Sequence, residues 1–118
     1  MKGDLKNQIT EVNGVNFIAT KVDLDPASIK TLLFELGGEV ENLFAVLGAS
    51  ASNDKATLTC FINKELANDK GYNAGTIVRE LGKHINGGGG GQNFFATAGG
   101  KNPAGIDKAI EEAKGYIN

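Results

Sequence analysis

Hydrophobic and polar residues alternate weakly along the first part of the chain. Residues 5–12 and 15–22 are two β-favouring runs separated by Asn13-Gly14. An Asn-Gly pair between such runs is a strong signal for a two-residue hairpin turn, because both residues tolerate a positive φ. The pattern predicts an antiparallel pair of strands at the N-terminal end.

The spacing then changes to that of a helix. Asp25 is the predicted N-cap, and Pro26 lies in the first turn. Apolar side chains follow at helical spacing: Ile29, Leu32, Leu33, Leu36 and Val40. Gly37-Gly38 weakens this helix by about 1 kcal/mol per glycine. The pair therefore predicts either close packing against a neighbour or an early end of the helix.

Two strongly apolar runs come next. Residues 43–49, LFAVLGA, are typical of a strand that is buried on both faces. Residues 57–62, TLTCFI, are rich in β-branched and aromatic side chains. Because the polar connection over residues 50–54 is short, we expect the two strands to pair as an antiparallel hairpin.

The second half predicts two more helices around a short strand. Asn73 caps the first, which ends at Asn86-Gly87, and residues 94–98 form the strand. Asn102-Pro103 then repeats the combination of cap and proline. The two helical stripes consist of Ile77, Val78, Leu81 and Ile85, and of Ile106, Ala109, Ile110, Ala113 and Ile117.

Together these elements indicate an α+β fold, a mixed α/β sandwich. We expect a small mixed or antiparallel sheet of about five strands, with about three helices on one face. Residues 1–118 fit a single globular domain, a fragment of a larger protein. Residues 1–8 are polar and are interpreted as a remnant of a preceding helical segment.

Composition narrows the chemistry. With one cysteine (Cys60) and one histidine (His84), the chain can form neither an internal disulfide nor a His/Cys zinc cage. Cys60 lies in an apolar run and is interpreted as a small buried residue. No signal peptide or membrane-length apolar run is visible, so we expect a cytoplasmic origin and no membrane partner. No acid–base constellation predicts catalysis by this domain.

The net charge of −2 hides an uneven distribution. No acidic residue lies between Glu80 and Asp107, whereas Lys83, His84 and Lys101 fall in that interval. A polyanion would be repelled least there. Ordinary surface charges would give the same pattern, so charge alone does not assign a nucleic-acid site.

Gly87 to Gly91 is a run of consecutive glycines, which is costly to order. It is open to three interpretations: a flexible linker, a backbone passing close to another element, or a loop whose bare N–H groups admit a phosphate, ribose or base. The third is favoured. The run lacks the Lys-Ser/Thr of a phosphate-binding P-loop and follows a helix, so neither familiar nucleotide motif fits.

The residues around the run extend this candidate site. Amides at Gln92 and Asn93 suit hydrogen bonds to nucleotide edges, and an exposed ring at Phe94 or Phe95 suits stacking on an unpaired base. At least one of these rings is expected in the core. Lys101 precedes a predicted helix N-terminus, which favours anions. The candidate nucleic-acid-binding residues are Lys83, His84, Gly87, Gly88, Gly89, Gly90, Gly91, Gln92, Asn93 and Lys101.

The order of these segments resembles a known family. Residues 73–81, the glycine run and residues 96–101 (ATAGGK) are similar to the DHH-associated domain at the C-terminus of alanyl-tRNA synthetases. The hairpin around Asn13-Gly14 resembles the opening of that domain. The resemblance covers residues 10–118. One departure is that Gln92 and Asn93 stand where many members carry a basic residue, which favours contact through shape and amides.

The resemblance implies a noncatalytic, tRNA-binding module that holds the tRNA elbow and helps couple aminoacylation with editing. It implies alanine tRNA, the other synthetase domains and a homodimer through the missing helical segment as partners. It places ATP, magnesium and zinc in other domains and no cofactor here. Two alternatives stay open: a substrate-binding domain of a DHH-type phosphoesterase, and an oligomerisation module.

Overall fold

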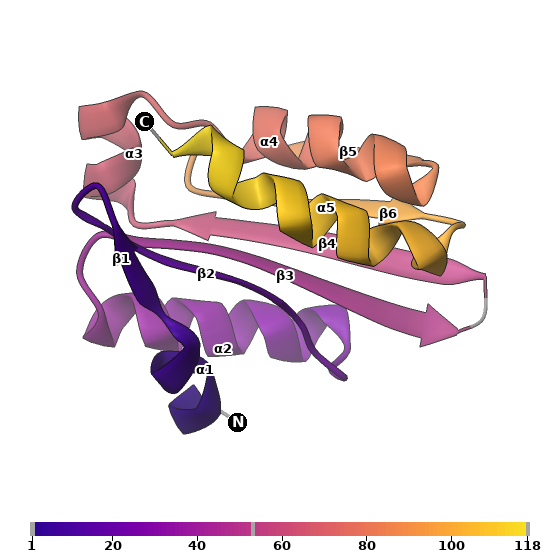
Figure 1. Ribbon diagram of the computed structural model, residues 1–118, viewed down its shortest axis with the longest axis horizontal. Helices are drawn as coiled ribbons and strands as arrows, with labels where there is room; N and C mark the ends of the chain where they lie inside the picture. Colours follow the sequence, from indigo (N-terminus) through magenta and orange to yellow (C-terminus); the bar gives the residue numbers. More distant parts are fainter. Residues whose placement is uncertain (1, 53, 118) are drawn as a thin grey trace.

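One six-stranded mixed sheet organises the chain (Figure 1). A computed structural model describes residues 2–52 and 54–117. The strand order is β1-β2-β3-β4-β6-β5, and only β2 and β3 run parallel to each other. The strands are β1 (Thr10–Val12), β2 (Val15–Lys21), β3 (Leu43–Ser52), β4 (Lys55–Ile62), β5 (Gly87–Gly91) and β6 (Phe95–Gly100).

Helices flank the sheet on both faces, which corrects the expectation of one covered face. Helix α2 lies on one side, and α3, α4 and α5 lie on the other. The α-helices are α1 (Lys2–Gln8), α2 (Pro26–Glu39), α3 (Lys64–Lys70), α4 (Ala74–Leu81) and α5 (Ile106–Ala113). Short 3₁₀ segments are η1 (Gly82–Ile85), η2 (Pro103–Gly105) and η3 (Lys114–Tyr116). None of the described helices is long and apolar enough to cross a membrane.

The predicted N-terminal hairpin is present but shorter than expected. β1 and β2 pair antiparallel, and Asn13 (φ 52°) and Gly14 (φ 83°) form the turn. The residues before Thr10 form α1 instead of a strand, because Leu5 is buried beside the α2 stripe and Lys6 pairs with Glu39. That α1 continues a preceding helical segment stays a prediction, and Met1 lies outside the described residues.

Helix α2 carries the chain from β2 back to the start of β3 and makes those strands parallel. Asp25 caps it as predicted, since the Ser28 N–H donates to the Asp25 carboxylate at 3.2 Å. Hydrogen bonds from the Ser28 side chain and then from its backbone N–H lower the pKa of that carboxyl. The helix continues to Glu39 without an early end. Gly37 packs directly on the Phe61 ring, where a Cβ would not fit. Close packing is therefore the correct interpretation of that glycine.

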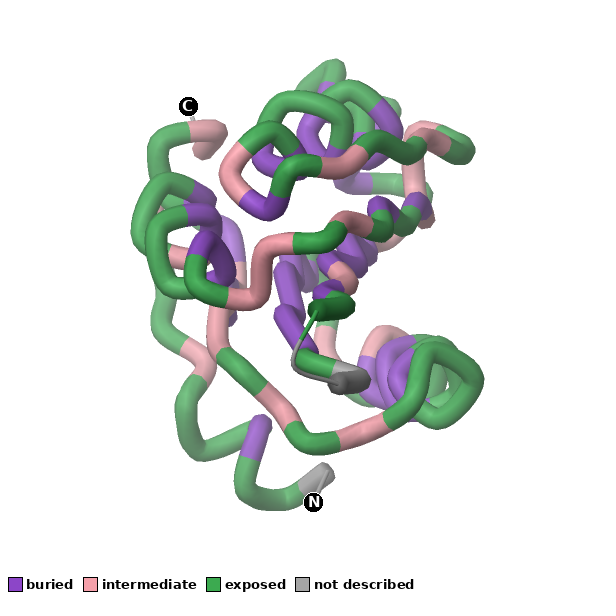
Figure 2. Tube along the Cα trace, turned by 90° about the vertical axis from the view of Figure 1, so that its right-hand side faces the viewer, coloured by how far each residue is buried: buried purple, intermediate pink, exposed green. Residues whose placement is uncertain are grey.

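The apolar run that begins β3 supplies both faces of the core, as expected. Phe44 and Val46 pack with the α3–α5 side, whereas Ala45 and Leu47 pack with α2. The antiparallel pairing of β3 with β4 is also confirmed. Figure 2 shows the buried segments concentrated between the sheet and its helices.

The helices differ from the sequence analysis in two details, one helix that was missed and one cap that is wrong. Helix α3 was missed because it has only seven residues, about two turns. It buries only Leu66 and Ala67, too few apolar positions to give a helical pattern in the sequence. Asn102 does not cap the last helix with its side chain. Its amide donates to the His84 backbone carbonyl at 3.2 Å instead, and the α-helix begins later, at Ile106.

Candidate nucleic-acid interface

The glycine run is a strand, which corrects the expectation of a glycine loop. β5 pairs antiparallel with β6, with Gly87 opposite Gly100 and Gly91 opposite Ala96. It forms one edge of the sheet. The ladder offsets part of the entropy cost of ordering five glycines, because the backbone groups along the paired edge are hydrogen-bonded.

Alternate glycines are required by how closely β6 approaches. A Cβ on Gly87 or Gly89 would overlap a β6 backbone carbonyl oxygen, and one on Gly91 would lie 2.6 Å from the Phe95 oxygen. A Cβ on Gly88 or Gly90 would meet nothing within 4 Å. Gly87, Gly89 and Gly91 thus allow the close approach of the two strands. Gly88 and Gly90 leave their own side of the strand without side chains, and this side is called the bare outer side of β5.

The turn that follows β5 is fixed to the start of α4. The Ala74 and Gly75 N–H groups donate to the Asn93 and Gln92 carbonyls at 3.0 and 3.2 Å. The Asn93 side-chain amide donates to the Asn68 side chain of α3 at 3.2 Å. Gln92 is exposed with its side chain outside this network. Of the two predicted amides, Gln92 is therefore the one that faces solvent.

The predicted cations gather at the Gly87 end of β5. Lys83 and Lys101 are exposed, and the Lys101 N–H donates to the Ile85 carbonyl at 2.9 Å, so η1 and the end of β6 lie together. His84 is less open, because its Nε2 lies 2.7 Å from the Glu112 carboxylate of α5. The segment between Glu80 and Asp107 contains no acidic residue, but in the folded chain Glu112 lies beside it.

A different arrangement forms at the Gly91 end. Phe94 and Phe95 are both half-buried, so neither lies within the core as expected, although Phe95 packs against its α2 side. The Lys64 ammonium lies 4.5 Å from the centre of the Phe94 ring, and the Lys30 ammonium lies 5.6 Å from that of Phe95. Phe34 of α2 lies 5.4 Å from Phe95, centre to centre.

Sequence reasoning missed Lys30, Phe34 and Lys64 as members of this region. They belong to α2 and α3, far from the glycine run along the chain. One signal was available: Phe34 lies off the buried stripe of α2, and it is 43% exposed. A large aromatic residue on the open side of an amphipathic helix is unusual, and Lys30 stands one turn before it.

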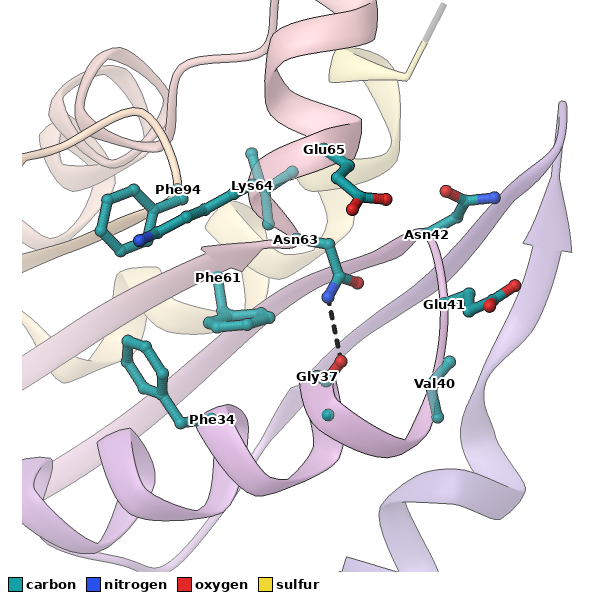
Figure 3. A pocket seen from close by; sticks show the side chains of 12 residues that line it. Phe34, Gly37, Val40, Glu41, Asn42, Phe61, Asn63, Lys64, Glu65 and Phe94 are labelled. Atoms are coloured by element: carbon teal, nitrogen blue, oxygen red, sulfur yellow. Dashed lines mark hydrogen bonds between the residues drawn. The ribbon is translucent and has the colours of Figure 1, made fainter.

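These residues line a groove of about 570 Å³ between α2 and the end of the sheet. Its lining consists of Lys30, Phe34, Lys64, Gly90, Gly91, Gln92, Phe94, Phe95, Ala96 and Thr97. A second cavity of about 650 Å³ adjoins it and shares Phe34, Lys64 and Phe94 (Figure 3). Among residues 2–52 and 54–117 no group of three His, Cys, Asp or Glu side chains is placed to hold a metal ion.

Comparison with known proteins places the chain among DHH-associated domains, as the resemblance indicated. Residues 14–118 match the DHHA1 domain. Over 117 residues, 99% of the chain, it is 56% identical to an alanine–tRNA ligase of Christiangramia forsetii and 44% identical to one of Flavobacterium psychrophilum. The chain spans 13% of the length of each of these relatives.

Two solved structures share the fold. The C-Ala domain of Aquifex aeolicus alanyl-tRNA synthetase superposes with a TM-score of 0.79 at 24% identity, covering 92% of this chain and 96% of that one. A DHH-domain protein described as a member of the S1p family of ribosomal proteins superposes with a TM-score of 0.62 at 13% identity, covering 94% of this chain and 28% of that one.

Proposed function

Because the chain belongs to the DHHA1 domain family, we propose that it is the noncatalytic, tRNA-binding C-terminal module of an alanyl-tRNA synthetase. The similarity to two alanine–tRNA ligases over 99% of the chain supports this parent protein. In the proposal the module holds the elbow of alanine tRNA and helps couple aminoacylation with editing, which other domains carry out. A preceding helical segment would supply the dimer contact.

The observation that carries the proposal is the bare outer side of β5. Gly88 and Gly90 leave open space where side chains would stand, so an RNA backbone can approach the strand closely. Exposed cations at the Gly87 end, Lys83 and Lys101, suit phosphate oxygens. The proposed contact residues are Lys83, His84, Gly87, Gly88, Gly89, Gly90, Gly91, Gln92, Asn93 and Lys101.

These residues have unequal roles in the proposal. Lys83 and Lys101 position phosphates without reading sequence. Gln92 donates and accepts hydrogen bonds at a base or ribose edge. His84 and Asn93 are tied to Glu112 and Asn68, so they shape the surface and contact RNA only at its margin. With a net charge of −2 the isolated domain binds weakly, and its binding falls as salt rises.

A fluorescence-anisotropy titration with full-length alanine tRNA at low and moderate salt tests this. Reversing both charges (Lys83→Glu with Lys101→Glu) should weaken binding about tenfold or more, because two phosphate contacts become repulsive. Lys114→Glu is the matched control, since it makes the same charge change in η3, outside the proposed surface. Absence of binding by the unmodified chain at low salt, or equal losses in all variants, contradicts the proposal.

A substrate-binding domain of a DHH-type phosphoesterase is the second candidate. The fold shared with a DHH-domain protein favours it. The two functions differ in what precedes this domain in its full-length protein, namely a metal-binding phosphoesterase domain or the aminoacylation and editing domains. The coding sequence upstream decides between them.

A further inference from the structure

Among the described helices, α2 packs on β3 and β4 and reaches β6 only at Phe95, so none covers the α2-side face of β5 and of the rest of β6. Along β6, Ala96 and Ala98 are buried in the core on the α3–α5 side, whereas Thr97 and Gly99 are exposed on the opposite side. Gly90 pairs with Thr97 and continues this open side onto β5. The result is a flat shelf beside α2, and the 570 Å³ groove occupies its Gly91 end.

Aromatic rings form the wall and the end of the groove. Phe34 packs edge-on against Phe61, with ring centres 5.2 Å apart and planes at 74°, and it also contacts Phe95. These contacts fix the Phe34 ring although it is 43% exposed. The neighbouring Phe94 ring is covered only by the Lys64 side chain among its described ring contacts. Preorganised, partly exposed rings of this kind form stacking platforms for nucleobases.

The charges in the groove have one sign. Lys30 and Lys64 are its two charged lining residues, and each holds its ammonium over a ring. In the adjoining cavity Glu41 and Glu65 lie on the side opposite the rings (Figure 3). A negatively charged ligand is therefore attracted at the α2–β6 side and repelled at the far side. This difference in charge orients the ligand in the groove.

The floor admits a flat group at close range. Gly90 presents no side chain, and Thr97 supplies the neighbouring position with a small polar group. A volume of about 570 Å³ lies within the range of about 300–1,000 Å³ that is typical of small-ligand sites. The combination of an aromatic wall, a bare floor and two cations suits a planar, polar ring carrying a phosphate better than it suits an apolar peptide.

We propose that this groove is a subsite for one unstacked nucleotide of the bound RNA, whose base stacks on Phe94 and Phe34 and whose phosphates lie against Lys64 and Lys30. The inference rests on the proposed function and adds to it a second contact, made by residues of α2 and α3. A protein segment is the competing occupant, and the experiment distinguishes the two.

The test uses the chain with alanine tRNA and, separately, with a single-stranded RNA of about seven nucleotides that contains 2-aminopurine. The emission of this base changes when it stacks, so it reports entry into the groove. Phe94→Ala should weaken tRNA binding about tenfold and abolish the emission change, because stacking on one ring is lost. Phe94→Trp should keep both. Lys30→Glu with Lys64→Glu should weaken both ligands.

Two controls make the outcomes separable. Lys70→Glu makes the same charge change at the far end of α3, and Lys83→Glu with Lys101→Glu should weaken tRNA while leaving the 2-aminopurine change intact. If the variants of Phe94, Lys30 and Lys64 bind tRNA normally while the Lys83/Lys101 variant does not, the subsite is overturned and the proposed function stands. If the unmodified chain binds neither RNA, both proposals fail.

Discussion

The two ends of strand β5 present cations in different ways. At the Gly87 end Lys83 and Lys101 are exposed, while His84 is held by Glu112. At the Gly91 end Lys30 lies over the Phe95 ring, which Phe34 contacts, and Lys64 lies over the Phe94 ring. Exposed cations suit the sequence-independent positioning of phosphates, whereas cations placed over aromatic rings suit recognition of one nucleotide.

The largest effect should come from the strand that joins both ends. Gly89→Ala places a Cβ 2.5 Å from the Ala98 Cα, so β5 must separate from β6. We expect a loss of unfolding free energy of about 1–3 kcal/mol or more, measured by urea denaturation. RNA contacts at both ends should weaken together.

Gly88→Ala is the matched control, because its Cβ meets no atom within 4 Å. Its unfolding free energy should stay within about 0.5 kcal/mol of that of the unmodified chain. Equal destabilisation by the two variants would mean that β5 does not pair with β6 in this register.

Salt dependence should separate the ends. Log affinity falls with log salt. Reversing Lys83 or Lys101 should make this negative slope shallower by about 1 each, because a phosphate contact is lost. Phe94→Ala should weaken tRNA binding and leave that slope unchanged, because stacking releases no counterions. Anisotropy titrations over a series of salt concentrations measure both, and a changed slope for Phe94→Ala would mean that its ring acts through Lys64.

Freeing His84 should have a smaller effect. Glu112→Gln removes the carboxylate beside the His84 ring, so the Gly87 end becomes less negative. We expect tRNA affinity to rise by about two- to threefold at low salt. Glu111→Gln, the same change on the preceding residue of α5, is the control. If both variants raise affinity equally, net charge is the cause and the His84 contact is not.

The smallest expected effect is the alkylation of Cys60 in the native chain. Cys60 lies on β4 opposite Ala96 of β6. Complete burial raises the pKa of its thiol well above the usual range, so the reactive thiolate is not populated in the folded chain. An alkylating reagent at mildly alkaline pH should leave native Cys60 unmodified and react after denaturation. Mass spectrometry measures this, and rapid native alkylation would show that the seam between β4 and β6 opens.

Local patterns in the sequence predicted most of the elements correctly. The hairpin at Asn13-Gly14, the Asp25 cap and the Asn73 cap all follow from residues next to one another, and the structure has each. The glycine run was the main error, because glycine disfavours strands in isolation. Only the pairing with β6, a long-range contact, makes Gly87 to Gly91 a strand.

The candidate site likewise contains residues that are neighbours along the chain and residues that only the fold brings together. Lys83, His84 and Lys101 were found because they stand near the glycine run along the chain. Lys30, Phe34 and Lys64 were missed, since they reach the same strand only through the placement of α2 and α3. Glu112 was missed for the same reason, so charge intervals along the sequence did not predict the charge beside His84.

An NMR titration tests most directly the claim that RNA binds at strand β5. The isotope-labelled chain is titrated with alanine tRNA at low salt, and each backbone amide is followed. We expect shifts or broadening at Gly88 and Gly90 within β5 and at Phe94 beyond its Gly91 end, with Lys108 and Lys114 near the C-terminus unaffected. Changes confined to α5 and η3, or none at any tRNA concentration, would contradict it.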